Sequence, residues 1–342
     1  MTRLFKLRLR AFIFLVIATA LVGAASEAFE ADIDDLDRIT SMVESAVLWG
    51  IGAVLVWGFE ILFVPSRFAA PLRQTNFLAV IAIKSVLVVT IFLAVYVIGQ
   101  SVFDQAERLL FEDGAFYREF AAVSIAVVAI QVFIQSTSIV GERQYLYFLL
   151  GRYHRPVEER KVFMFLDLAG STSLARWMGD LGVQRMITRF FRDIDEPIAE
   201  HRGEVHRYVG DQVVVTWRLS ERGDNMDPIR CCFAIQARME DLANEYQQEF
   251  GVVPSYRIGL HGGPVIISEC GERRREISYF GDTVNTAARI EQACKPYGVD
   301  LLVSKGLTDW VRLDPGYTLT RVGSLELRGR DESTELFSLQ RS

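Results

Sequence analysis

Two aspartates that follow apolar strands are the residues of this chain best suited to chemistry. Residues 162–166 are five consecutive apolar residues, typical of a strand buried on both faces, and they run directly into Asp167. About forty residues further on, a Gly210-Asp211 turn lies between two more strands. A carboxylate at the end of a buried strand costs free energy unless a cation or hydrogen-bond donors meet it. Because Mg²⁺ takes one or two carboxylates together with substrate phosphates, the pair indicates a site for a metal-bound nucleotide.

Small residues follow Asp167 at once and leave room for a phosphate. Their backbone N–H groups can approach an anion before the helix that we expect from Leu174. The candidate phosphate-binding residues are Ala169, Gly170, Ser171 and Thr172.

Length and composition favour two domains, one of them in a membrane. The chain has 342 residues, half of them hydrophobic, and the apolar excess lies before residue 140. A net charge of −6 offers no basic stripe for a phosphate backbone, so we expect no nucleic-acid partner. The four cysteines include no CxxC pair, and free thiols in a reducing compartment are the plain interpretation.

Apolar segments predict a transmembrane domain over residues 1–140 that lies in the lipid bilayer. The first segment is short and follows four basic residues, so it is either a retained span, which we favour, or a cleaved signal peptide. Glu60 and Lys84 fall inside expected spans, either as a buried pair or with Lys84 extended to the membrane surface. The expected spans are residues 11–25, 42–64, 77–99 and 119–140.

The charges between the spans predict the orientation. Residues 26–41 and 100–117 are acidic on balance, whereas residues 65–76 and 143–161 carry the basic residues. The positive-inside rule therefore places everything after residue 141 in the cytoplasm of a multi-pass protein of the cell membrane. Residues 141–160 are expected to form a linker that extends the last span as a helix until Gly151.

Residues 161–342 alternate strand and helix patterns. The expected helices are 174–179, 184–201, 228–250 and 283–293, with strands between and after them. This order favours an α+β sandwich with helices on one face of the sheet. The run 272–276 predicts a solvated hairpin arm.

Four separated motifs in this half, taken in order, resemble the class III nucleotidyl cyclases, which make cyclic AMP or cyclic GMP. The resemblance implies a ferredoxin-like βαββαβ core sheet and a homodimer in which each site takes residues from two cyclase domains. This chain has one such domain with both sets of residues. The motifs are residues 165–172, 207–211, 281–289 and 327–330.

The resemblance also implies the site residues. Asp167 and Asp211 match the carboxylates that hold two Mg²⁺ or Mn²⁺ ions per site, with the backbone carbonyl of Leu168 as a further ligand. Asn285 and Arg289 match the catalytic pair that positions the ribose and stabilises charge at the α-phosphorus. In the last motif Arg328 is the better match for the β/γ-phosphate contact, and Arg330 is the second choice.

The two positions that correspond to base recognition depart from the family pattern. At the position of Arg207, adenylyl members typically have Lys and guanylyl members typically have Glu. At the position of Ser278, adenylyl members typically have Asp or Thr and guanylyl members typically have Cys. Arg207 can only donate, which suits adenine N1 but also guanine O6 and N7. We therefore expect an adenylate cyclase that uses ATP. The alternatives are a guanylate cyclase or a catalytically inactive cyclase-like membrane receptor.

Overall fold

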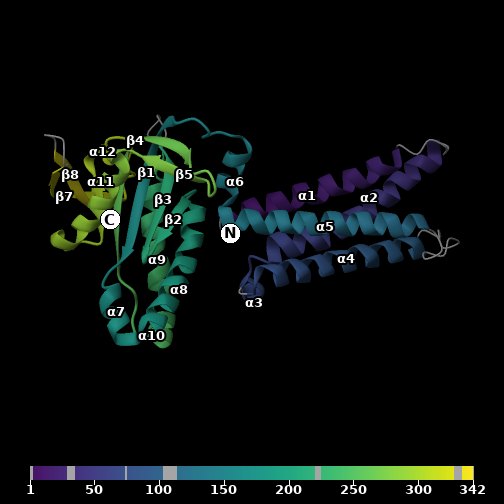
Figure 1. Cartoon of the computed structure of the whole chain (residues 1–342), viewed down its shortest axis with the longest axis horizontal. Helices are drawn as coiled ribbons and strands as arrows, with labels where there is room; N and C mark the ends of the chain where they lie inside the picture. Colours follow the sequence, from purple (N-terminus) through teal and green to yellow (C-terminus); the bar gives the residue numbers. More distant parts are fainter. Residues whose placement is uncertain are drawn as a thin grey trace. The chain divides into compact units, whose positions relative to one another are not determined.

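The computed structural model describes residues 3–28, 35–73, 75–102, 114–219, 225–326 and 333–341. The chain divides into two compact units, an N-terminal unit of Met1–Leu146 and a C-terminal unit of Tyr147–Ser342. Figure 1 labels the helices and strands of both units. Each unit is described separately below.

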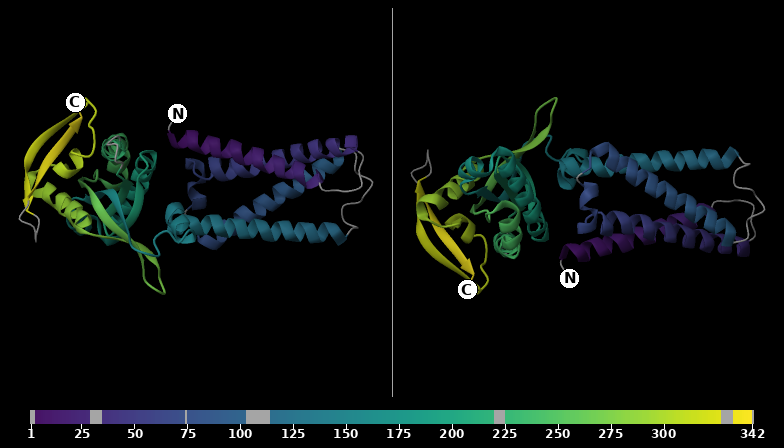
Figure 2. Two further views of the ribbon diagram at one scale, coloured as in Figure 1. Left: turned by 90° about the horizontal axis from the view of Figure 1, so that it is seen from above. Right: turned by 90° about the horizontal axis from the view of Figure 1, so that it is seen from below.

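The N-terminal unit consists of helices (Figure 2). Among the described residues, three of them are long and apolar enough to cross a membrane, over Arg3–Ala25, Ile39–Phe63 and Phe77–Ile98. In the last long helix the apolar stretch is shorter, Ser124–Thr137. The helices are α1 (Arg3–Ala28), α2 (Asp35–Trp57), a π-helical turn (Gly58–Phe63), a 3₁₀ turn (Arg67–Ala69), α3 (Ala70–Arg73), α4 (Phe77–Val102) and α5 (Gly114–Val140).

The first helix is longer than the apolar segment 11–25 on which it was predicted. It begins at Arg3 because the arginines, lysine and leucines before residue 11 are good helix formers. Three of the four predicted spans thus coincide with helices of sufficient length and hydropathy. The fourth span stays a prediction.

Glu60 and Lys84 form a buried ion pair inside the N-terminal unit. Their Oε1 and Nζ atoms are 2.6 Å apart, and the side chains are 13% and 5% exposed. Glu60 lies in the π-helical turn, a local widening of the helix that is frequent at functional positions. The structure supports the buried pair rather than a lysine extended to the membrane surface.

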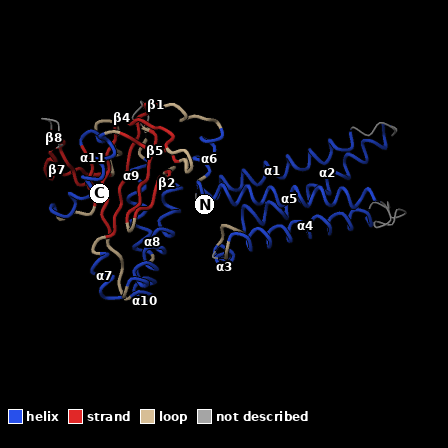
Figure 3. Tube along the Cα trace, viewed as in Figure 1, coloured by secondary structure: helices blue, strands red, loops and turns tan. Residues whose placement is uncertain are grey.

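The C-terminal unit is built on one sheet in the order β2-β3-β1-β4-β6-β8-β7, with β5 paired to β4. Figure 3 draws its strands in red. Strands β2, β3, β1 and β4 are neighbours and pair antiparallel, which is the ferredoxin-like arrangement expected from the sequence. The strands are β1 (Val157–Leu168), β2 (Glu204–Val209), β3 (Gln212–Arg218), β4 (Tyr256–Cys270), β5 (Glu276–Phe280), β6 (Leu301–Ser304), β7 (Tyr317–Glu326) and β8 (Ser333–Arg341).

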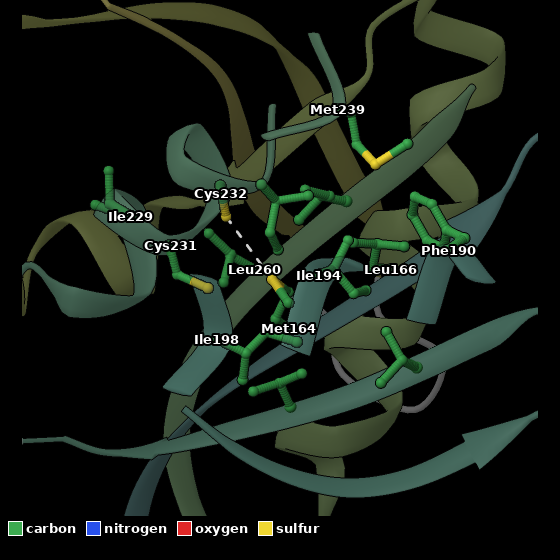
Figure 4. Packing of buried hydrophobic residues seen from close by; sticks show 14 of the residues in the cluster. Met164, Leu166, Phe190, Ile194, Ile198, Ile229, Cys231, Cys232, Met239 and Leu260 are labelled. Carbon is green, nitrogen blue, oxygen red and sulfur yellow. Dashed lines mark hydrogen bonds between the residues drawn. The ribbon is translucent and has the colours of Figure 1, made fainter. Parts of the chain in front are cut away.

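Strand β1 is buried on both faces, as its apolar run predicts. Met164 and Leu166 point into a core with Phe190 and Ile194 of α8 and Ile229 of α9 (Figure 4). The helices of this unit are α7 (Ser171–Met178), α8 (Asp180–Glu200), α9 (Asp227–Asp241), α10 (Ala243–Phe250), α11 (Asp282–Tyr297) and α12 (Lys305–Thr308), and the boundary between the units falls within α6 (Glu142–Leu149). The stretch predicted as one helix over 228–250 is therefore two helices.

Helix α11 covers the opposite face of the sheet, where Phe163 and Phe165 pack with Ala287. The helices thus lie on both faces rather than on one. Gly259 of β4 permits this close approach, since a Cβ there would lie 2.2 Å from the backbone nitrogen of Glu291. The sequence carries this information only as one glycine in a strand.

The partly buried side chain of His261 in β4 should make the folded protein less stable at acidic pH. Its Nδ1 is 2.7 Å from Oγ of Ser304, which itself accepts from the backbone N–H of Leu307 at the start of α12. Burial lowers the pKa of His261 from 6.5 to about 4. Between these values the unfolded chain binds the proton and the folded chain does not, so stability is lost as the pH falls from 6.5 towards 4.

We expect the free energy of unfolding to decrease by up to about 2 kcal/mol over that range, and His261→Gln to reduce the decrease. Denaturant titration of both proteins at several pH values measures it. An unchanged pH dependence in the variant would contradict the assignment to His261.

Candidate active site

The fold places Asp167 and Asp211 side by side. Asp167 is opposite Gln212 in the β1–β3 pairing, so Asp211 at the β2–β3 turn lies next to it. The backbone N–H of Leu168 donates to the carbonyl of Asp211 at 3.3 Å, which ties the strand end to the turn. Gly210 has φ 62°, a left-handed conformation that glycine adopts without strain. The predicted pair is therefore brought together.

The two carboxylates repel each other. Burial and then the charge of Asp211 raise the pKa of Asp167 from 3.8 to about 6, while Arg257 acts in the opposite direction. Arg257 is opposite Asp167 in the β1–β4 pairing, where paired residues share a face. Sequence reasoning missed Arg257 because its relation to Asp167 depends on strand register.

Glu291 of α11 adds further negative charge to this region. Its side chain is buried, and burial followed by the charge of Asp167 raises its pKa from 4.5 to about 7. No motif in the sequence analysis drew attention to it, because its position follows from how α11 packs against β4. The region therefore favours a cation.

The donor set fits Mg²⁺ or Mn²⁺. Carboxylate and carbonyl oxygens are the ligands that these hard cations prefer, and an octahedral ion leaves positions for phosphate oxygens. Within the described ranges, no group of three or more His, Cys, Asp or Glu side chains is arranged to hold a metal. A metal at Asp167, Asp211 and the carbonyl of Leu168 would thus need further ligands from a substrate.

Among the described residues, the segment after Asp167 has backbone N–H groups without protein partners at Ser171 and Thr172, but not at Ala169. The N–H of Ala169 is already used, since it donates to the carbonyl of Ser255 at 2.8 Å. Gly170 has φ 75° and precedes α7, which begins at Ser171 rather than at the expected Leu174. Ser171 and Thr172 are therefore in the first turn of a helix, where N–H groups lack intrahelical partners.

Asn285 and Arg289 share a face of α11, as their spacing predicts. Asn285 is exposed, and neither side chain makes a hydrogen bond or ion pair within the part of the chain that the structure describes. The cation that acts on the pKa of Asp167 is Arg257, not Arg289. Among the described residues of one chain, no hydrogen bond or ion pair links the Asn/Arg face to the carboxylates.

Arg207 and Ser278 are brought together by a third residue, Glu276. Nη2 of Arg207 is 2.7 Å from Oε1 of Glu276, and Oγ of Ser278 donates to the same oxygen at 3.4 Å. The sequence predicts a solvated hairpin arm over residues 272–276, without a contact between Glu276 and β2. Its contact with β2 follows from the path of β5, which pairing patterns in the sequence do not reveal.

Arg328 and Arg330, the residues expected at the β/γ-phosphates, lie outside the described residues. Their predicted role stays a prediction.

The sequence and fold identify the family. A model of the adenylate and guanylate cyclase catalytic domain matches residues 155–340, which is more than half of the chain. The chain belongs to this family. The match confirms the resemblance and includes every site residue discussed above.

Known cyclases are similar to the C-terminal unit. Over 201 residues the chain is 38% identical to adenylate cyclase 2 of Rhizobium meliloti (strain 1021), covering 59% of this chain and 55% of that protein. Over 167 residues it is 27% identical to retinal guanylyl cyclase 2 of Homo sapiens, covering 48% and 15%. The chain thus spans about half the length, or less, of these relatives.

Solved cyclase structures share the fold. A bacterial light-regulated adenylyl cyclase matches with a TM-score of 0.52 at 21% identity, over 64% of each chain.

Removing one carboxylate should stabilise the metal-free protein. Asp211→Asn removes the charge that raises the pKa of Asp167, so we expect the free energy of unfolding at neutral pH to rise by about 1 kcal/mol in chelator. The same variant should lose the stabilisation that Mn²⁺ gives the wild type. Thermal unfolding with and without Mn²⁺ measures both effects.

The matched control is Asp241→Asn, at an exposed position of α9, which should respond to Mn²⁺ as the wild type does. Equal stabilisation of Asp211→Asn and wild type by Mn²⁺ would remove Asp211 from the metal site.

Proposed function

We propose that this protein is a membrane-bound adenylate cyclase that converts ATP to 3′,5′-cyclic AMP and pyrophosphate at two sites of a homodimer. The observation that carries the proposal is the combination found in one chain. Asp167 and Asp211 are held together and repel each other, whereas Asn285 and Arg289 form a face without partners among the described residues. The carboxylate pair needs a cation with a bound nucleotide, and the Asn/Arg face supplies groups that bind the same nucleotide.

The nucleophile in this reaction belongs to the substrate. The 3′-hydroxyl of ATP gives its proton to water, and its oxygen attacks the α-phosphorus. A new P–O3′ bond forms, and the bond between the α-phosphorus and the oxygen that bridges to the β-phosphate breaks to release pyrophosphate. Mg²⁺ or Mn²⁺ held by Asp167, Asp211 and the Leu168 carbonyl would supply Lewis acidity for the hydroxyl and charge neutralisation for the triphosphate. No Ser–His–Asp or Cys–His arrangement is needed from the protein.

The chain's own residues bind and orient the nucleotide. Arg289 is a planar cation suited to an oxygen of the α-phosphoryl group, where charge develops, and Asn285 four residues earlier suits the ribose. The N–H groups of Ser171 and Thr172 are donors for phosphate oxygens. Arg257, opposite Asp167, adds positive charge on the same strand face.

The homodimer follows from the separation of the two halves. In a two-fold dimer the same patch of each subunit faces the other, so one interface forms two equivalent sites. Each site would combine Asp167 and Asp211 of one subunit with Asn285 and Arg289 of the other. A monomer would be inactive.

ATP is the proposed substrate, supported by the similarity to adenylate cyclase 2 of Rhizobium meliloti. GTP is the alternative, because the donor Arg207 also suits guanine and a guanylyl cyclase is among the relatives. The catalytically inactive receptor is disfavoured by the presence of all four residues Asp167, Asp211, Asn285 and Arg289. The charge pattern between spans supports a cytoplasmic C-terminal unit, the side on which ATP is present.

The test of this function is product formation by the purified full-length chain in lipid nanodiscs. With Mn²⁺ we expect cyclic AMP from ATP, and loss of the product in excess chelator because the carboxylate pair requires a cation. Chromatography of the products after incubation with ATP or GTP measures it. Formation of cyclic GMP alone would contradict ATP as the substrate and favour a guanylate cyclase. The absence of product from both nucleotides would contradict the cyclase function and favour the catalytically inactive receptor.

Two inactive variants should restore activity when they are combined. Asp167→Ala and Asn285→Ala remove different halves of the site, so each alone should lose activity by at least about 100-fold. A mixed dimer of the two variants has one intact site of two, so isolated mixed dimers should show about half of the wild-type activity. Co-expression with two affinity tags isolates the mixed dimers for assay.

The matched control combines Asp167→Ala with Asp211→Ala, which remove the same half and should restore nothing. An isolated mixed dimer of Asp167→Ala and Asn285→Ala without activity would exclude shared sites.

A further inference from the structure

We propose that Glu276 is a specificity-determining residue of the cyclase site, which accepts a hydrogen bond from the 6-amino group of adenine. This inference rests on the proposed adenylate cyclase function. It adds an acceptor to the two positions, Arg207 and Ser278, that the family resemblance assigns to the base.

The position of Glu276 is fixed by the strand that carries it. Alternate residues of β5 point to opposite faces, so Glu276 and Ser278 share one face while Ile277 and Tyr279 share the other. Ile277 is buried, and the ring of Tyr279 packs on Phe163 with centroids 5.3 Å apart. These apolar contacts anchor β5 through one face and present Glu276 and Ser278 on the other.

The same anchor brings β5 to β2. The ring of Tyr279 also meets His206 edge to face, with centroids 4.6 Å apart. The next residue of β2 is Arg207, whose Nη2 lies 2.7 Å from Oε1 of Glu276. A single carboxylate oxygen thus contacts both base-position residues, since Ser278 Oγ is 3.4 Å from it.

The chemistry of adenine requires an acceptor at this place. Its Watson–Crick edge presents a donor, the 6-amino group, beside an acceptor, N1. Arg207 can only donate, whereas the hydroxyl of Ser278, whose proton is directed to Glu276, keeps oxygen lone pairs that can accept a hydrogen bond from the amino group. An ionised carboxylate only accepts, and Oε2 of Glu276 makes no hydrogen bond among the described residues.

The ion pair between Glu276 and Arg207 contributes little to the stability of the fold. Both side chains are 46% exposed, and exposed ion pairs contribute little to stability. What the pair does is hold the guanidinium in one orientation, with its remaining N–H groups available for adenine N1. Substitutions of Glu276 should therefore leave the fold intact.

The test compares ATP with purine riboside triphosphate, which has N1 but lacks the 6-amino group. The affinity of the full-length protein for each nucleotide is measured by competition against a fluorescent ATP analogue with Mg²⁺ present, so turnover is not needed. The wild type should bind ATP at least about tenfold more tightly than the analogue. Glu276→Ala should lose most of that preference, because it weakens the binding of ATP more than the binding of the analogue, which loses only the orientation of Arg207 towards N1.

The variant Glu276→Gln distinguishes the hydrogen-bond acceptor of Glu276 from its negative charge. Its amide oxygen can still accept, so it should retain part of the preference that Glu276→Ala loses. Glu272→Ala, at an exposed position of the same hairpin, is the matched control and should bind both nucleotides as the wild type does.

Equal weakening of both nucleotides by Glu276→Ala would overturn the proposal, because it would show that Glu276 acts only through Arg207. A wild type without preference for ATP over the analogue would overturn it as well. These outcomes are separate from the proposed function, which fails when the wild type forms no cyclic AMP, whatever the binding preferences are.

Discussion

The repulsion between Asp167 and Asp211 is the interaction on which the rest of the site depends. Strand β1 is buried on both faces and carries Asp167 next to its last residue, and the β2–β3 turn brings Asp211 beside it. Burial, and then the charge of Asp211, raise the pKa of Asp167 to about 6, which means that the ionised pair is unfavourable without a cation. The fold thus holds a destabilising arrangement, which in the proposed function a metal-bound nucleotide relieves.

A second constraint concerns the Asn/Arg face of α11. Asn285 and Arg289 have no partners among the described side chains, and the cation that acts on the pKa of Asp167 is Arg257. In the proposed function a second copy supplies the missing half at each site. Under that proposal dimerisation is a condition for catalysis, and anything that changes how two subunits meet also changes the rate. The N-terminal unit, with its three apolar helices, is one place where such control can originate.

The sequence predicted the elements that depend on local pattern. The double burial of β1, the Gly210-Asp211 turn and the shared face of Asn285 and Arg289 all follow from residue types and spacing. Features that depend on register or packing were missed. Arg257 and Glu276 reach the site only through strand pairing and the path of β5, and α11 covers the second face because Gly259 lets its backbone approach.

The most direct test of this account is a cryo-electron microscopy structure of the full-length protein with Mn²⁺ and a non-cyclising ATP analogue. The account predicts two analogues per dimer, each bound by Asp167 and Asp211 of one subunit and by Asn285 of the partner subunit. An analogue held by all of these residues from a single chain would contradict it.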